Sequence, residues 1–81
     1  MADRNEDRTE EIARIRGVVA SNLEKALDAR GLSRTEVIAL AGVSRSMLYD
    51  VLGSRRAATI DFLTRLTVVL DIEVRDFFDE E

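Results

Sequence analysis

Four polar residues near the middle of the chain have side chains that can hydrogen-bond to the edges of nucleic-acid bases: Arg45, Ser46, Tyr49 and Asp50. Apolar residues around them recur at helical spacing, which places these polar side chains on the outward face of one short helix. A helix that projects polar side chains from its first turn, and is anchored by its other face, fits the major groove of duplex DNA. The alternative is a plain corner between two helices of a small helical domain.

The segment that must position these residues, 33–52, predicts two short helices joined by a tight turn. Ser33 and Glu36 have capping-box spacing, and Gly42 suits the left-handed residue that ends a helix. Ser44 is placed to cap the second helix. The apolar residues expected to anchor the corner are Val37, Ala41, Val43, Leu48 and Val51. The pattern therefore favours a helix-turn-helix corner with its polar face outward.

The composition favours one all-α domain without catalytic chemistry. The chain has 81 residues, of which 46% are hydrophobic, few are aromatic and none is proline, cysteine or histidine. The lack of both cysteine and histidine excludes the common zinc sites and the Ser-His and Cys-His catalytic arrangements. No glycine-rich phosphate loop is visible. We therefore expect no enzymatic activity, no metal, no cofactor and no small-molecule pocket.

The distribution of charge is more informative than the net charge of −4. Residues 1–11 carry −3 and residues 71–81 carry −5, whereas residues 12–70 carry +4. A basic centre between acidic ends is compatible with DNA binding, because affinity for DNA depends largely on the neutralisation of phosphates. The acidic ends should weaken non-specific binding.

No apolar run approaches the roughly 18 residues that a membrane-spanning helix needs, and nothing resembles a signal peptide. We therefore expect a cytoplasmic protein, associated with the nucleoid when bound to DNA, and no membrane partner.

The N-terminal part of the chain predicts a charged tail followed by an amphipathic helix. Residues 1–11 contain almost nothing that could be buried and are expected to be flexible. Apolar residues then recur at three- and four-residue steps from Ile12 to Arg30. Gly17 marks either a kink or a later start of this helix. Ile12 and Ile15 lie ahead of the section that a core needs, so they are expected to pack elsewhere, against a second chain for example.

Two further helices are expected after the corner. The loop 53–59 carries two adjacent arginines, and Thr59 caps a helix that reaches residue 70. A short terminal helix then precedes the acidic end, residues 79–81. Apolar residues beyond the inward stripe suggest a dimer interface, for which the candidates are Phe62, Val69 and Phe78. The alternative is that Phe62 or Val69 widens the core face.

From about Val19 to Phe78 the chain resembles the phage repressor/Cro-type (XRE-like) helix-turn-helix family. The resemblance lies in the segments ARGLSRTEVIALAGVSRSMLYDVL and TIDFLTRLTVVLDIEVRDFF. It implies a five-helix, lambda-repressor-like DNA-binding domain over residues 12–78. It further implies a homodimer that binds a palindromic operator in double-stranded DNA, usually as a transcriptional repressor. The same fold serves as the DNA-binding half of antitoxins and in restriction-modification controllers.

The family's DNA contacts can be carried over by position. Base-reading positions are matched by Arg45, Ser46 and Asp50, beside Tyr49 on the same face. Arg45 could pair with guanine, and Asp50 could either accept a hydrogen bond from cytosine or orient a nearby arginine. The residues at or near backbone-contact positions are Ser33, Arg34, Ser44, Arg55 and Arg56.

The chain departs from the family pattern at several positions. Ile38 replaces a small residue between the two helices of the corner, and Ser54 replaces a common glycine. Leu27 and Leu52 stand where many relatives have a buried Arg–Glu pair. Because both partners are replaced, the two leucines can pack together without leaving a buried charge unpaired.

Two other functions remain open from the sequence. The protein could be an antitoxin whose acidic ends neutralise a basic toxin partner. It could also be a protein-interaction module that keeps the fold without binding DNA.

Overall fold

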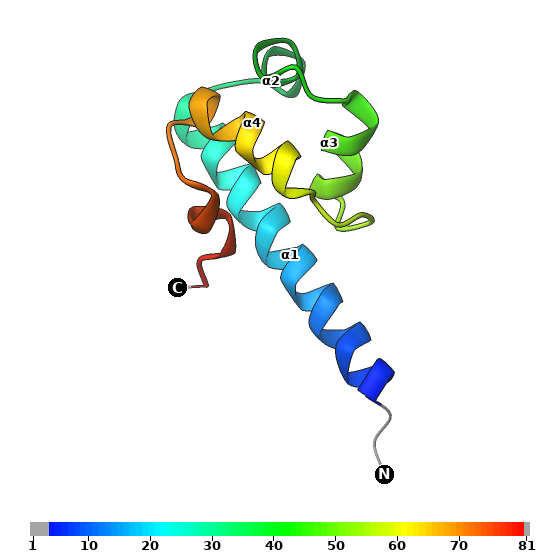
Figure 1. Cartoon of the computed structure of the whole chain (residues 1–81). Helices are drawn as coiled ribbons and strands as arrows, with labels where there is room; N and C mark the ends of the chain where they lie inside the picture. The colour runs from blue at the N-terminus through cyan, green and yellow to red at the C-terminus, as the bar shows by residue number, and fades with distance from the viewer. Residues whose placement is uncertain (1–3, 81) are drawn as a thin grey trace.

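The computed structural model describes residues 4–80, with side chains from Arg8 onward, and is helical without any strand over that range. Its elements are α1 (Arg4–Arg30), α2 (Arg34–Ala41), α3 (Arg45–Leu52), α4 (Ile60–Leu70) and the 3₁₀ helix η1 (Val74–Phe78) (Figure 1). The all-α prediction is confirmed. The predicted count of five helices is not, since the fifth element is a five-residue 3₁₀ helix beside four α-helices.

Helix α1 is longer than the sequence pattern indicated. It begins at Arg4 rather than at Ile12, so most of the predicted flexible tail is helical, while residues 1–3 lie outside the described part of the chain. Gly17 neither kinks nor starts the helix, which runs unbroken past it to Arg30 (Figure 1). Gly31, with a φ of 64°, then provides the left-handed residue that ends α1.

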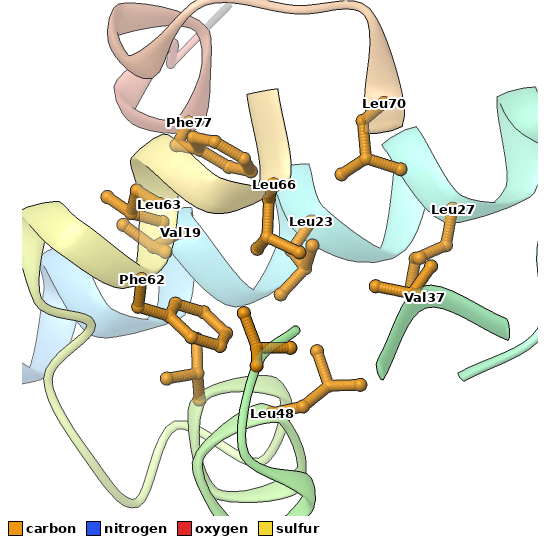
Figure 2. Close-up of a cluster of buried hydrophobic side chains, with 12 residues drawn as sticks. Val19, Leu23, Leu27, Val37, Leu48, Phe62, Leu63, Leu66, Leu70 and Phe77 are labelled. Carbon is orange, nitrogen blue, oxygen red and sulfur yellow. The ribbon is translucent and has the colours of Figure 1, made fainter. Parts of the chain in front are cut away.

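The core forms where α1, α4 and the helix-turn-helix meet (Figure 2). Its buried residues are Val19, Leu23, Leu27, Val37, Val43, Leu48, Val51, Phe62, Leu63, Leu66, Leu70 and Phe77. No polar or charged residue is buried in the described part of the chain. Each fully buried Val, Leu or Phe contributes roughly 1.5–3 kcal/mol of transfer free energy. This apolar packing fixes the orientation of α2 and α3.

Two positions that depart from the family pattern belong to this core. Leu27 is buried, and Leu52 is a partly buried residue packed against the same cluster. Ile38 also packs partly buried against it. Both leucines therefore lie in or against the apolar core.

One face of α1 also holds the C-terminal segment in place. The Asn22 side chain donates hydrogen bonds from Nδ2 to the backbone oxygens of Phe77 at 2.8 Å and Asp79 at 2.9 Å. Phe77 is fully buried beside α4 (Figure 2). Helix α1 thus contacts α3, α4 and η1, whereas α2 packs against α4 and α3.

Candidate nucleic-acid interface

Hydrogen bonds at the helix ends fix the turn between α2 and α3. The Ser33 N–H donates to Glu36 Oε1 at 3.0 Å, and Ser33 Oγ accepts from the Glu36 N–H at 3.1 Å. The Ser33 backbone and side chain together hold the pKa of the Glu36 carboxyl below its ordinary value. Gly42 ends α2 with a φ of 66°, and Ser44 Oγ accepts from the Met47 N–H at 3.2 Å. The structure confirms each cap that the sequence predicted here.

Helix α3 is anchored by its apolar face and presents its polar face outward. The corner is held by the buried residues Val37, Val43, Leu48 and Val51. On the opposite face, Arg45 and Ser46 are exposed at the first turn of α3. Tyr49 is 37% exposed, and Asp50 is partly buried one residue further on. The structure therefore brings the four predicted base-reading residues onto one accessible face.

Tyr49 organises two arginines on that face. The guanidinium carbon of Arg34 lies 5.6 Å from the centre of the Tyr49 ring, and that of Arg45 lies 5.9 Å from it. Both distances allow a cation–π interaction, which is worth about 0.5–1 kcal/mol at an exposed site. The ring thus joins an arginine of α2 to an arginine of α3.

Arg34 is also paired with a carboxylate from α1. Its Nη2 lies 3.0 Å from Glu24 Oε2, and both side chains are roughly half exposed. No sequence pattern indicates this pair, because the nine intervening residues include the turn that brings the two helices together. Glu24 is therefore a residue of the candidate interface that sequence reasoning missed.

Asp50 is surrounded by the two arginines of the following loop. Its carboxylate lies 3.4 Å from Arg55 Nη2 and 4.0 Å from Arg56 Nη1. Arg55 Nη2 also donates to the backbone oxygen of Tyr49 at 3.2 Å. The sequence left open whether Asp50 reads a base or orients an arginine. In this structure it pairs with Arg55 and Arg56, and not with Arg45.

The loop geometry lets Arg55 fold back over α3. A Cβ built on Gly53 would lie 2.8 Å from Arg55 Cζ, so the guanidinium occupies space that only glycine leaves free. Ser54 takes a φ of 59°, the left-handed conformation that favours the glycine common at this position in the family.

Arg65 of α4 is a second residue that sequence reasoning missed. It lies near the N-terminal end of α3, where its Nη1 would be 3.9 Å from a Cβ built on Gly42. A shallow hollow there is lined by Arg65 together with Arg56 and Ser44. The sequence feature that could have identified Arg65 is its position on α4, outside the apolar stripe of that helix.

The three predicted dimer residues have different environments. Phe62 is only 5% exposed and lies in the core (Figure 2), so its assignment to a dimer interface was wrong. Phe62 instead belongs to the core face of α4, which was the alternative that the sequence left open. Val69 is partly buried, whereas Phe78 is 40% exposed.

Phe78 lies at the rim of an apolar groove of about 280 Å³ between α1, η1 and the loop before α4. The groove is lined mainly by Ile12, Ile15, Val19, Val51, Ala57, Ala58 and Phe78, with Glu11, Arg16 and Arg56 as its charged residues. Ile12 is 50% exposed. Nε of Arg16 is buried and lacks a hydrogen-bond partner among the described residues.

Among the described residues, no cluster of acidic side chains could hold a metal ion, and no helix is both long and apolar enough to cross a membrane. The chemistry available at the candidate interface is therefore that of arginine, hydroxyl and carboxylate side chains.

Comparison with known proteins identifies a similar solved structure. The chain resembles the crystal structure of the restriction-modification controller protein C.AhdI from Aeromonas hydrophila, with a TM-score of 0.72 and 28% sequence identity. The match covers 78% of this chain and 96% of that one. No family model matches the chain, and neither does any curated protein sequence. The helix-turn-helix and this similarity confirm the resemblance to the repressor/Cro-type family.

Proposed function

We propose that this protein is a sequence-specific regulator of transcription that binds double-stranded DNA as a homodimer on a palindromic operator. It acts as a repressor in the cytoplasm, by occupying the operator, and residues 12–78 form its DNA-binding domain. The observation that carries the proposal is the accessible face of α3, where Arg45, Ser46 and Tyr49 project from a helix whose other face is buried.

The arginines around that face support the same proposal. Arg34 precedes the reading residues, and Arg55 and Arg56 follow them, so basic side chains flank α3 on both sides. Such an arrangement suits a protein that positions itself through phosphates and reads bases between them. The similarity to a restriction-modification controller protein favours a regulatory role over that of an antitoxin or an interaction module.

Selection from a pool of random duplexes tests the proposal directly. We expect a palindromic consensus with half-sites about 10 base pairs apart, since that spacing places two recognition helices in successive major grooves. The affinity for the best duplex should fall with salt, with a slope of about −0.9 for each phosphate contact. Binding without any consensus would contradict a sequence-specific regulator.

Single variants then separate base reading from backbone contact. Arg45→Ala should cost about 1–3 kcal/mol on the operator and relax the preference at one base pair, because a bidentate contact to guanine is lost. Arg56→Ala should weaken binding to every duplex similarly and reduce the salt slope by about one. Equal losses on all duplexes for Arg45→Ala would contradict its reading role.

A further inference from the structure

The four arginines that the sequence predicted to contact DNA fall into two groups in the free protein. Arg34 is paired with Glu24, and Arg55 and Arg56 are both close to Asp50. Arg45, by contrast, forms no ion pair with any residue that the structure describes. The arginines expected to contact phosphates are therefore held by carboxylates, and the arginine expected to read a base is not.

This division matters because phosphates and carboxylates compete for the same guanidinium groups. Non-specific affinity for DNA comes almost entirely from the neutralisation of phosphates. An arginine that must first leave a carboxylate contributes less to that affinity, and the remaining carboxylate repels the DNA backbone. The base contact of Arg45 carries no such penalty.

We propose that Glu24 and Asp50 are specificity-determining residues, which restrain the phosphate-binding arginines and thereby suppress binding to DNA of arbitrary sequence. The inference rests on the proposed DNA-binding function. On this view Asp50 does not read cytosine, and Glu24 acts from α1 although it belongs to neither helix of the helix-turn-helix.

The shape of the loop is consistent with a built restraint for Arg55. Its guanidinium donates hydrogen bonds to the Asp50 carboxylate and to the backbone oxygen of Tyr49 simultaneously. It lies over Gly53, where any larger residue would displace it. Gly53 itself has a φ of −87°, which alanine adopts without strain, so a side chain there would act by displacing the Arg55 guanidinium and not by straining the backbone.

The test compares Glu24→Gln, Asp50→Asn and the double variant with the wild type on random duplexes and on the selected operator. Each single variant should raise affinity for random duplexes by about two- to fivefold, the range expected when one surface ion pair no longer competes. The salt slope should steepen by about one for each arginine released. The ratio of operator to random affinity should fall, since the non-specific complex gains most.

Asp71→Asn is the matched control. Asp71 forms a comparable pair with Arg30 at 4.0 Å, and neither residue belongs to the candidate interface. Asparagine tolerates the left-handed φ of 55° that Asp71 adopts. The control makes the same change in net charge, so a rise in affinity limited to the two interface variants supports the inference.

Gly53→Ala removes the restraint on Arg55 without any change in charge. It should raise affinity for random duplexes, as Asp50→Asn does. The gain should be smaller, because the Asp50 carboxylate stays in place. Circular dichroism and thermal unfolding establish that each variant is folded before binding is measured.

Three outcomes would overturn the inference. One is a loss of affinity in Asp50→Asn confined to operators with one particular base pair, which would make Asp50 a base reader. Another is an equal gain in the Asp71→Asn control, which would reduce the effect to net charge. The third is that Glu24→Gln and Asp50→Asn both bind random duplexes with the same affinity as the wild type. If neither the wild type nor any variant binds duplex DNA, the proposed function fails and the inference fails with it.

Discussion

At the scale of single residues, Tyr49 combines a structural and a functional position. Its ring lies partly exposed on the outward face of α3, and the guanidinium groups of Arg34 and Arg45 lie over it. The sequence assigned Tyr49 to base reading, for which the hydroxyl would be the active group. The geometry favours the ring, because an aromatic face holds both arginines whether or not the hydroxyl is present.

Tyr49→Phe and Tyr49→Ala separate these two roles. We expect Tyr49→Phe to bind the operator within about twofold of the wild type, because the cation–π interactions persist. Tyr49→Ala should weaken binding by about 1–2 kcal/mol, the worth of two exposed cation–π contacts. Fluorescence anisotropy on the selected operator measures both. A change of base preference in Tyr49→Phe would show instead that the hydroxyl reads the DNA.

The parts of the site that could not be predicted from the sequence depend on residues that lie apart along the chain. Arg45, Ser46 and Tyr49 were found because they share one face of a single helix, which periodicity alone reveals. The pairing of Arg34 with Glu24 was not found, and the pairing of Asp50 with a nearby arginine was only one of two alternatives. Glu24 belongs to another helix, and the pairing of Asp50 depends on how the loop after α3 folds back, which no local pattern encodes.

At the scale of elements, η1 depends on α1, to which the C-terminal segment is tied by the Asn22 side chain and by the Arg14–Glu80 ion pair. The structure shows Asn22 donating to two backbone oxygens of the C-terminal segment, and only Phe77 of η1 is buried. A 3₁₀ helix of five residues has poor hydrogen-bond geometry of its own and needs such tertiary support.

Asn22→Ala should lower the free energy of unfolding by about 1 kcal/mol. Each lost hydrogen bond contributes roughly 0.5–1.5 kcal/mol, and the higher helix propensity of alanine offsets part of that loss by about 0.6 kcal/mol. Urea unfolding followed by circular dichroism measures the change. Ser21→Ala, at the exposed neighbouring position, is the control and should not destabilise the protein. Equal stability of the Asn22→Ala variant and the wild type would mean that the two Asn22 hydrogen bonds are not needed to hold η1, whose apolar residues Val74 and Phe77 pack in or against the core.

The elements themselves were predictable where a cap or an apolar stripe marks them. The caps at Ser33, Ser44 and Thr59 fixed the starts of α2, α3 and α4. The start of α1 was missed because residues 4–11 include no apolar residue, and a helix without an apolar stripe leaves no hydrophobic pattern in the sequence. Local ion pairs such as Glu11–Arg14, which lowers the pKa of Glu11, support such a helix instead.

At the scale of the whole molecule, the apolar groove is the surface that fits the proposed homodimer. Ile12 and Phe78 are both large, apolar and about half exposed at its rim. The groove also offers charges of both signs, Glu11 and Arg16, which can pair across a self-complementary two-fold contact between identical chains. A second copy of this chain, contributing its own Ile12, is therefore the occupant that the proposal selects.

Ile12→Glu should make the protein monomeric at concentrations where the wild type is a dimer, because a carboxylate would have to be buried in the apolar contact. Val68→Glu is the matched control, since Val68 is a comparable residue on α4 that is 86% exposed and lies outside the groove. Sedimentation equilibrium gives the dissociation constant of each.

If Val68→Glu dissociates into monomers while Ile12→Glu stays dimeric, the dimer interface lies on the outer face of α4 and not at the groove. A wild-type protein that stays monomeric even on the operator would contradict the homodimer itself.

The continuity of α1 has a consequence for how its amide hydrogens exchange with solvent. Beyond Gly17 the helix carries core residues from Val19 to Leu27, so these amides should exchange only when the whole domain unfolds. Ahead of Gly17, Ile15 is the hydrophobic residue of α1 that packs against the core, among the side chains that the structure describes. The amides of this part of the helix should therefore exchange by local fraying. One unbroken helix would then show two exchange regimes, and association through the groove would slow the faster one as protein concentration rises.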